Sequence, residues 1–233
     1  MTNNTKLLDT EKQKVINRYT ERFKLHGHSP KTLGWDKGKQ DLRYHILFDS
    51  FDLRGKSILD IGCGFGDALK LIKNRTEEFQ FTGIDIVPNF IEKAREANIN
   101  SSNIQFICDD FLSHHFGTQF DIIVASGPFN FKLKDQDNLG FIDACMRKAM
   151  SLCREGLAFD FLSNQVDFEY EHTFHSDPCA ILAMAYQHSR NVVLRNDYMP
   201  FEFSLSIAKN DAFSKNDTIF ERFKSERDYY RFY

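Results

Sequence analysis

From residue 57 onward, short apolar segments alternate with longer segments in which apolar residues recur every three or four positions. A short, nearly continuous apolar segment predicts a strand buried on both faces, whereas the wider spacing predicts a helix packed along one side. Helices between successive strands give parallel β-α-β units. The segments expected as strands are 57–61, 79–85, 103–110, 120–127, 155–163, 191–197 and 200–209, and those expected as helices are 67–74, 88–98, 138–153 and 177–189.

The last two predicted strands, 191–197 and 200–209, are separated by too few residues for a helical crossover. They are therefore expected to pair antiparallel. Together with the preceding strands they predict an α/β fold with a Rossmann-like, seven-stranded, mostly parallel sheet. Helices should cover both faces of this sheet, and an antiparallel strand pair should end it.

The chain before this pattern is organised differently. An amphipathic helix is predicted at 9–25, with Val15, Ile16, Tyr19 and Phe23 on one side, then a basic and aromatic loop at 26–40 and a helix at 40–51. We therefore expect three parts. These are an N-terminal helical cap and lid at 1–54, a ligand-binding domain at 55–209, and a polar aromatic tail at 210–233, whose exposed rings would include Tyr229, Tyr230, Phe232 and Tyr233.

Composition narrows the class of protein. The 233 residues carry a net charge of −3, which disfavours a broad nucleic-acid-binding face. The five cysteines are widely spaced and odd in number, so we expect neither a disulfide framework nor a metal site. No apolar run approaches the ~20 residues of a membrane helix, and the N-terminus lacks a signal-peptide pattern. A cytoplasmic protein with no membrane partner is expected, and its oligomeric state is not readable.

The stretch SILDIGCGFGDAL carries the main chemical signal. Gly62, Gly64 and Gly66 follow the first predicted strand, where glycine lets the backbone approach a ligand that a Cβ would exclude. Asp85 ends the second strand, where a carboxylate can accept hydrogen bonds from both hydroxyls of a ribose. A nicotinamide dinucleotide is one candidate ligand. However, Asp60 lies two residues before the first glycine and would repel a pyrophosphate, whereas it could serve a cationic amino-acid group.

Four motifs in this order resemble the class I S-adenosylmethionine-dependent methyltransferases over about residues 55–209. They are ILDIGCGFGD at 58–67, GIDIVPNFIEKAR at 83–95, FICDDFL at 106–112 and FDIIVASG at 120–127. The resemblance implies S-adenosylmethionine as the cofactor. It places Asp85 at the ribose, Ile86 beside the adenine, Asp110 (or Asp109) at the adenine amino group, the Phe111 backbone at the ring, and Ala125 and Ser126 near the methionine moiety.

The methyl acceptor is narrowed by exclusion. Relatives that methylate adenine or glutamine have an Asn/Asp-Pro-Pro-Tyr/Phe stretch after the fourth strand, whereas this chain has SGPFNF at 126–131. Relatives that methylate cytosine at C5 have a Pro-Cys nucleophile after the fourth strand. Here the Pro-Cys pair is Pro178–Cys179, which starts a later predicted helix, and the preference for proline at the first helical position explains it more simply. A small molecule, or a small group on a carrier, is therefore the expected acceptor, with O-methylation favoured. The segments 34–40 and 196–207 resemble bacterial methyltransferases associated with surface polysaccharides, and this resemblance suggests a sugar, or a phosphate-derived group on a nucleotide carrier, as the acceptor.

Two polar and aromatic segments, 9–43 and 165–178, are expected to close over the site. Trp35 could cover the cofactor or the acceptor, and Arg43 could pair with the cofactor carboxylate. His28 and His175 are the candidate catalytic bases, because each lies in a predicted lid beside a proline turn. Further candidates in these segments are Tyr19, His26, Lys39 and His172. A nicotinamide-dependent oxidoreductase and a non-catalytic cofactor-binding module remain the alternative functions.

Overall fold

A single sheet of seven strands, in the order β3-β2-β1-β4-β5-β7-β6, forms the centre of the computed structural model, which describes residues 6–34, 39–213, 215–216 and 218–223. The strands are β1 (Lys56–Ile61), β2 (Phe79–Asp85), β3 (Ile104–Cys108), β4 (Phe120–Ala125), β5 (Cys153–Leu162), β6 (Val192–Arg195) and β7 (Glu202–Ala208). The helices are α1 (Asp9–His26), α2 (Gln40–Leu47), α3 (Ala68–Arg75), α4 (Pro88–Ala97), α5 (Asn138–Leu152) and α6 (Pro178–Ala185), with short 3₁₀ turns at Pro128–Asn130 and Glu221–Phe223.

The predicted fold class is confirmed. Strands β1 to β5 pair in parallel, and β7 runs antiparallel to both β5 and β6. The strand expected at 103–110 ends earlier, at Cys108. It ends there because the Asp110 carboxylate accepts hydrogen bonds from the Leu112 N–H at 3.1 Å and the Ser113 hydroxyl at 2.6 Å, which fold the chain into a turn.

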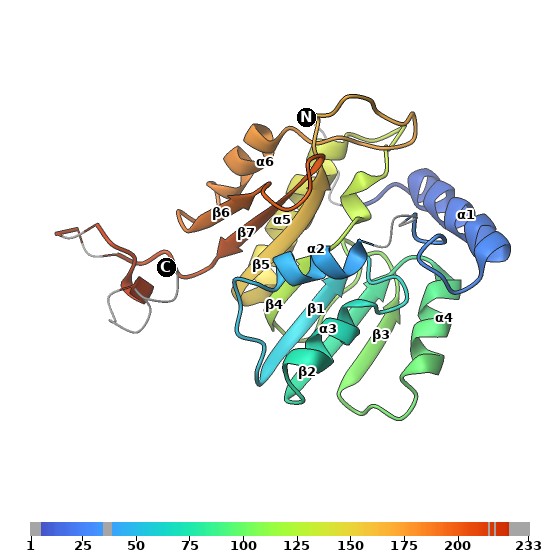
Figure 1. Cartoon of the computed structure of the whole chain (residues 1–233), viewed down its shortest axis with the longest axis horizontal. Helices are drawn as coiled ribbons and strands as arrows, with labels where there is room; N and C mark the ends of the chain where they lie inside the picture. Colours follow the sequence, from blue (N-terminus) through green and yellow to red (C-terminus); the bar gives the residue numbers. More distant parts are fainter. Residues whose placement is uncertain (1–5, 35–38, 214, 217, 224–233) are drawn as a thin grey trace.

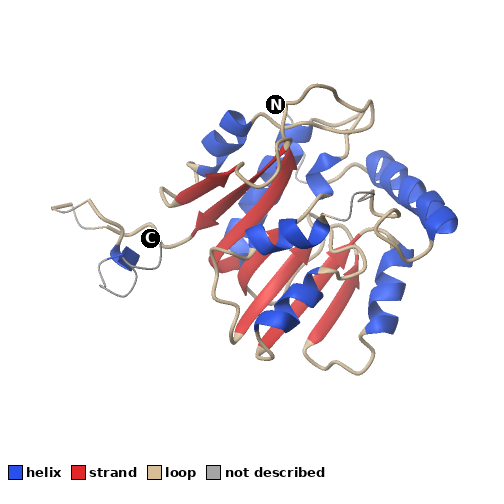
Figure 2. Ribbon diagram, viewed as in Figure 1, coloured by secondary structure: helices blue, strands red, loops and turns tan. Residues whose placement is uncertain are grey.

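Helices lie on both sides of the sheet (Figure 2), and alternate side chains of the central strands enter two separate cores. Ile58 and Ile122 pack with α2, α3 and α4 on one face, whereas Leu59 and Ile123 pack with α5 and α6 on the other. This arrangement explains why the strands read as nearly continuous apolar runs. Because α2 contributes Tyr44, Leu47 and Phe48 to the first core, it belongs to the sheet's own packing, and the division at residue 54 remains a prediction.

Helix α1 lies outside these two layers, against the start of α4 (Figure 1). Tyr19 packs edge-on against Phe90 with ring centroids 5.7 Å apart, and Phe23 contacts both Phe65 and Phe90. Phe65 follows β1 and Phe90 begins α4, so both rings sit at the carboxyl ends of the first two strands. The predicted apolar side of the helix is therefore what holds α1 over this edge of the sheet.

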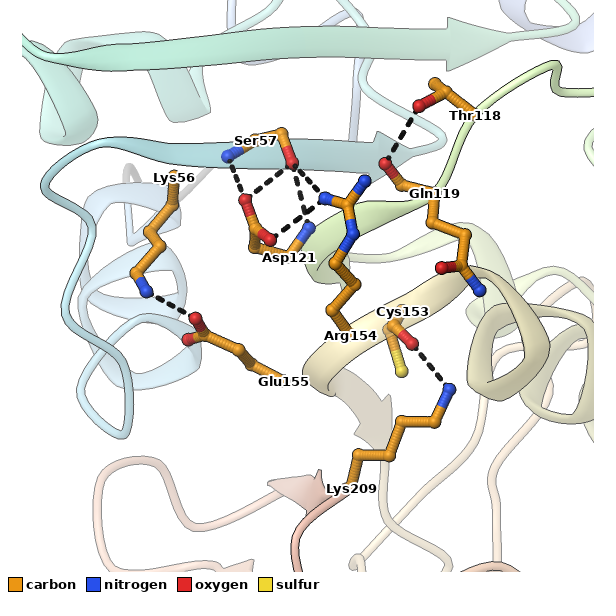
Figure 3. A network of polar contacts seen from close by, with 9 residues as sticks. All are labelled: Lys56, Ser57, Thr118, Gln119, Asp121, Cys153, Arg154, Glu155 and Lys209. Carbon is orange, nitrogen blue, oxygen red and sulfur yellow. Dashed lines mark hydrogen bonds and ion pairs between the residues drawn. The ribbon is translucent and has the colours of Figure 1, made fainter.

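A polar network holds the opposite edge of the sheet together (Figure 3). The Asp121 carboxylate at the start of β4 accepts hydrogen bonds from the Ser57 N–H at 2.8 Å and the Ser57 hydroxyl at 2.7 Å. Arg154 of β5 pairs with the same carboxylate at 3.0 Å. Burial alone would raise the pKa of Asp121, but these hydrogen bonds from Ser57 and Arg154 lower it. The network fixes where the parallel strands begin and leaves their other ends for ligands.

The described part of the segment after β7 runs away from the sheet (Figure 1). An isolated bridge joins Phe213 to Phe220, and their rings lie 6.4 Å apart. The tail aromatics Tyr229, Tyr230, Phe232 and Tyr233 fall outside the described residues. No helix within the described ranges is both long enough and apolar enough to span a bilayer.

Candidate functional site

The turn after β1 presents bare backbone at the edge of the sheet. Gly62 has a φ of 70°, which a residue with a Cβ adopts only with strain. A Cβ on Gly62 would lie 2.9 Å from the Cβ of Pro128, which belongs to the turn after β4. The N–H groups of Gly62 and Cys63 both donate to the Ile84 carbonyl, at 2.8 and 3.2 Å. The sequence at position 62 is therefore dictated by close approach between the ends of β1, β2 and β4.

Asp85, the last residue of β2, faces this turn. Its carboxylate accepts the N–H of Gly64 and the N–H of Val87, each at 2.9 Å. Burial raises the pKa of Asp85 to about 6, although the backbone hydrogen bonds act to lower it. An ionised carboxylate has about four acceptor sites, so Asp85 keeps sites for ligand hydroxyls after both backbone donors are bound. This placement suits the predicted ribose contact.

One pocket lies at the carboxyl ends of β1 to β4 and holds about 1010 Å³, counting its open mouth. Ligands of open α/β sheets bind where strand order reverses, and here that point lies between β1 and β4. Eight of the eleven predicted cofactor residues line the pocket: Gly62, Gly64, Asp85, Ile86, Asp109, Asp110, Phe111 and Ser126. The structure thus brings together residues from four separate motifs of the sequence.

The two acidic residues after β3 have different surroundings. The Asp110 side chain is nearly buried and forms the turn described above. Asp109 is more open and pairs with His114, with 2.9 Å between the carboxylate Oδ2 and the ring Nδ1. Burial would raise the pKa of Asp109, but the hydrogen bond from His114 brings it below its usual value. Which of the two carboxylates meets the adenine amino group remains a prediction.

Asp60 lies behind the pocket and not in its lining. Its side chain is fully buried, and burial raises its pKa well above the usual value. Tyr44 lines the pocket, and its hydroxyl lies 3.5 Å from Asp60 Oδ2, whereas Oδ1 has no hydrogen-bond partner within the described structure. A buried acceptor without a donor costs about 1–3 kcal/mol. The structure does not bring Asp60 to the pocket lining, so its contact with a cationic amino group remains a prediction.

The structure does not bring Arg43 to the pocket lining. Its guanidinium is buried and pairs with Glu202 of β7, with Nε 2.6 Å from Oε2. A bidentate pair of this kind satisfies the guanidinium inside the protein. The predicted contact between Arg43 and the cofactor carboxylate is therefore not what this structure shows. Trp35 lies outside the described residues.

Neither candidate histidine lines the pocket. His28 is exposed, and its ring lies against Phe65 with centroids 4.2 Å apart. The ring of His175 is held by the Ser163 carbonyl at 2.7 Å and the Thr173 hydroxyl at 3.0 Å, so both nitrogens have partners. The structure therefore places both predicted bases away from the cavity. Of the further candidates, Tyr19 lines the pocket, whereas His26, Lys39 and His172 are exposed outside it.

Glu11 is a residue that the sequence analysis missed. Its side chain is fully buried, and Oε1 accepts the N–H groups of Lys134 and Asp135 at 3.0 and 2.7 Å. Leu7 and Val15, one helical turn to either side, both line the pocket. Glu11 therefore fastens α1 to the segment after β4 beside the cavity. The sequence contained a signal for Glu11, because this residue lies on the same face of the helix as Val15 and Tyr19.

Glu11→Ala is expected to lower the free energy of unfolding by about 2 kcal/mol, because two backbone N–H groups lose their acceptor. Urea denaturation monitored by circular dichroism measures the change. Glu21→Ala is the matched control, since Glu21 is an exposed residue of the same helix and its ion pair with Lys24 is exposed as well. Equal stability losses in the two variants would show that Glu11 does not fasten the helix.

Comparisons with known proteins agree with the site. A methyltransferase domain family matches residues 58–156. The chain is 30% identical over 158 residues to the Mycobacterium tuberculosis protein named "Putative methyltransferase Rv1506c", a match that covers 66% of this chain and 93% of that protein. It is 38% identical over 90 residues to the malonyl-[acyl-carrier protein] O-methyltransferase of Acetivibrio thermocellus, covering 37% of this chain but only 31% of that enzyme.

Among solved structures, the magnesium protoporphyrin IX methyltransferase of Synechocystis PCC 6803 with bound S-adenosylmethionine superposes with a TM-score of 0.63. The superposition covers 87% of this chain and 98% of that one at 14% identity, which is a likeness of fold.

The doubly wound sheet, its glycine turn and the acid that ends β2 define a Rossmann-like ligand-binding protein. The comparisons then identify the family within this fold class. The chain belongs to the class I methyltransferases and is an S-adenosylmethionine-dependent methyltransferase. This finding supports the methyltransferase interpretation over a nicotinamide-dependent oxidoreductase and over a non-catalytic module.

Proposed function

We propose that this protein methylates a hydroxyl group on a small molecule or on a small group linked to a carrier. The observation that carries the proposal is the lining of the pocket beyond the glycine turn. Ten lining residues lie outside the four cofactor motifs, and most of them are apolar. The apolar ones are Leu7, Val15, Leu33, Pro128, Phe131, Leu133 and Phe141, and the polar ones are Tyr19, Gln40 and Tyr44. A mostly apolar wall with a few polar groups suits a small ligand.

The charges in the pocket favour an uncharged methyl-accepting group. Among the described residues that line it, the charged side chains are Asp85, Asp109 and Asp110, all of them acidic. A phosphate or carboxylate inside the pocket would meet carboxylates and no cation from these residues. A hydroxyl, such as that of a sugar, has no such cost. If the acceptor is carried on a nucleotide, as the sequence suggests, we expect the carrier phosphate to stay outside the cavity.

The relatives support transfer to oxygen. The Acetivibrio protein is by name an O-methyltransferase that acts on malonyl-[acyl-carrier protein], and a second protein of that name, from Anoxybacillus flavithermus, is 26% identical over 121 residues. The chain spans less than half the length of either, so its own acceptor is a matter of proposal. These names favour oxygen as the acceptor atom and a carrier-linked substrate; because a malonyl group offers a carboxylate, they do not bear on the choice of a hydroxyl.

Methyl-labelled S-adenosylmethionine incubated with the purified protein and an extract of the source cells tests this function. The extract is separated into small-molecule, protein and nucleic-acid fractions, and the labelled product is characterised by mass spectrometry. We expect the label in the small-molecule or carrier fraction, bound to oxygen. Label on nitrogen, or in nucleic acid alone, would contradict the proposal. Asp85→Ala protein in the same extract controls for methyl transfer by other enzymes.

A further inference from the structure

A buried serine–aspartate pair lies at the wall of the pocket, in and behind the turn that follows β4. Ser126, the first residue after β4, lines the pocket, and Asp160 of β5 is buried behind it. The Ser126 hydroxyl donates to Asp160 Oδ2 at 2.6 Å, and the Gly127 N–H donates to Oδ1 at 2.8 Å. One carboxylate thus holds both the hydroxyl and the backbone of the turn that follows β4.

The position of this turn places Ser126 next to the cofactor side of the pocket. The side chain of Pro128 lies against Gly62, so the turns after β1 and β4 touch. Ser126, Gly127 and Pro128 all line the same cavity as Gly62 and Gly64. An acceptor that meets a cofactor bound over the glycine turn would therefore lie in the cavity that Ser126 lines.

We propose that Ser126 and Asp160 form a relay that removes the proton of the acceptor hydroxyl. This inference rests on the O-methylation proposed above. The acceptor O–H gives its proton to Ser126 Oγ, while the Ser126 hydroxyl proton moves to Asp160 Oδ2. The acceptor oxygen forms a bond to the methyl carbon, and the S–CH₃ bond breaks with its electron pair left on the now neutral sulfur. Asp160 returns its proton to solvent after the product leaves.

The other polar groups of the pocket suit this role less well. The Tyr44 hydroxyl lies 3.5 Å from Asp60, at the limit of a hydrogen bond, compared with 2.6 Å between Ser126 and Asp160. His28 and His175 do not line the cavity. Asp160, which the sequence did not predict, is hydrogen-bonded directly to a hydroxyl-bearing residue of the pocket lining.

The surroundings of Asp160 give it the properties of a base at neutral pH. Burial raises its pKa to about 6, Arg43 and the hydrogen bond from Ser126 act to lower it, and Glu202 raises it. Asp160 is thus ionised at pH 7 and more basic than an exposed carboxylate. The titratable and charged groups that face it come from three further parts of the chain: Asp60 of β1, Arg43 and Tyr44 of α2, and Tyr198 and Glu202 at the start of β7.

The test compares Asp160→Asn, Ser126→Ala and the double variant with the wild type. The substrates are saturating methyl-labelled S-adenosylmethionine and the extract fraction that yields the labelled product. Wild-type kcat is expected to fall as the pH drops below about 6. Each single variant should lose about tenfold or more in kcat and lack this pH dependence. Because the two residues act in series, the double variant should be no slower than either single one.

Two measurements separate the relay from a structural role. Ser57→Ala and Asp121→Asn break a comparable serine–aspartate hydrogen bond at the opposite edge of the sheet (Figure 3), and they should leave the pH profile of kcat unchanged. Infrared titration of the protein without substrate should show two carboxyl groups with pKa values near 6, those of Asp85 and Asp160, and Asp160→Asn should remove one of them.

Each outcome decides the matter. An O-methylated product with wild-type kcat in Asp160→Asn or Ser126→Ala overturns the relay and leaves the proposed function standing. Losses that multiply in the double variant, or a pH profile that survives in both single variants, show that the pair only holds the turn. A product methylated on nitrogen overturns the proposed function and the relay together.

Discussion

Asp85→Ala is expected to weaken the binding of S-adenosylhomocysteine about 10- to 150-fold, the equivalent of about 1.5–3 kcal/mol for lost hydrogen bonds to a charged group. The expected loss has two physical sources. The variant removes the carboxylate expected to receive the ribose hydroxyls, and it also removes the acceptor that fixes the N–H groups of Gly64 and Val87. Isothermal titration calorimetry measures the affinity, and circular dichroism confirms that the variant is folded.

Glu77→Ala is the matched control for this prediction. Glu77 is an exposed carboxylate just before β2 begins, so it lies at the other end of the strand that Asp85 terminates. Its removal should leave the affinity unchanged. If a folded Asp85→Ala protein bound S-adenosylhomocysteine as tightly as the control, the assignment of Asp85 to the ribose would be wrong.

The affinity should also depend on pH through the same carboxylate. Burial raises the pKa of Asp85 to about 6 in the protein without ligand. Above this pH the group is ionised and accepts hydrogen bonds, whereas below it the ligand must first displace a proton. Affinity for S-adenosylhomocysteine should therefore be constant above about pH 7 and fall by up to about tenfold per pH unit below 6. Calorimetry from pH 5 to 8 measures this, and Asp85→Asn should flatten the dependence.

Gly62→Ala is expected to lower the free energy of unfolding by about 3 kcal/mol and to weaken cofactor binding. Left-handed backbone at a residue with a Cβ costs about 1–2 kcal/mol. The new methyl group would also lie 2.9 Å from Pro128, so the turn after β4 must move, at a cost typical of overpacking. Because Ser126 and Gly127 belong to that turn, the pocket changes shape as well. Urea denaturation and calorimetry measure the two effects.

Gly55→Ala separates the cost of the left-handed backbone from the cost of the close contact with Pro128. It precedes β1, has a φ of 71°, and a Cβ placed on it would meet nothing within 4 Å. Gly55→Ala should therefore cost only the conformational strain, about 1–2 kcal/mol, and leave ligand affinity unchanged. Equal stability losses for Gly55→Ala and Gly62→Ala would mean that Pro128 yields freely and that close packing does not dictate glycine at position 62.

Much of this fold could be predicted because its strands are buried on both faces. Segments such as 79–85 read as strands from sequence alone, and the structure has β2 at the same residues. The glycine turn and Asp85 were also predictable, since local backbone requirements restrict the residue types at those positions. The boundary of β3 was not, because it depends on whether the Asp110 side chain takes part in a turn or faces a ligand.

The unpredicted parts of the site depend on partners far away in the sequence. Arg43 was expected at the cofactor, but nothing near it in the chain indicates that Glu202 receives its charge. His175 was a reasonable base by position, yet a carbonyl and a hydroxyl hold its ring. Asp160 was not predicted as a site residue, because it lies in the middle of a segment expected as a buried strand. Such roles follow from tertiary contacts and not from periodicity.

The ion pair between Arg43 and Glu202 bears on how this protein can be divided. It joins α2 to β7, two elements that lie on opposite sides of residues 58–156, the part that the methyltransferase family model covers. A fragment that kept only one of the two elements would leave a buried charge unpaired, at a cost of about 3–5 kcal/mol. A fragment trimmed to residues 58–156 would lose both members together with the last two strands of the sheet. The part of the chain needed for folding is therefore longer than the segment that the family model matches, and expression boundaries should enclose residues 40–208 at least.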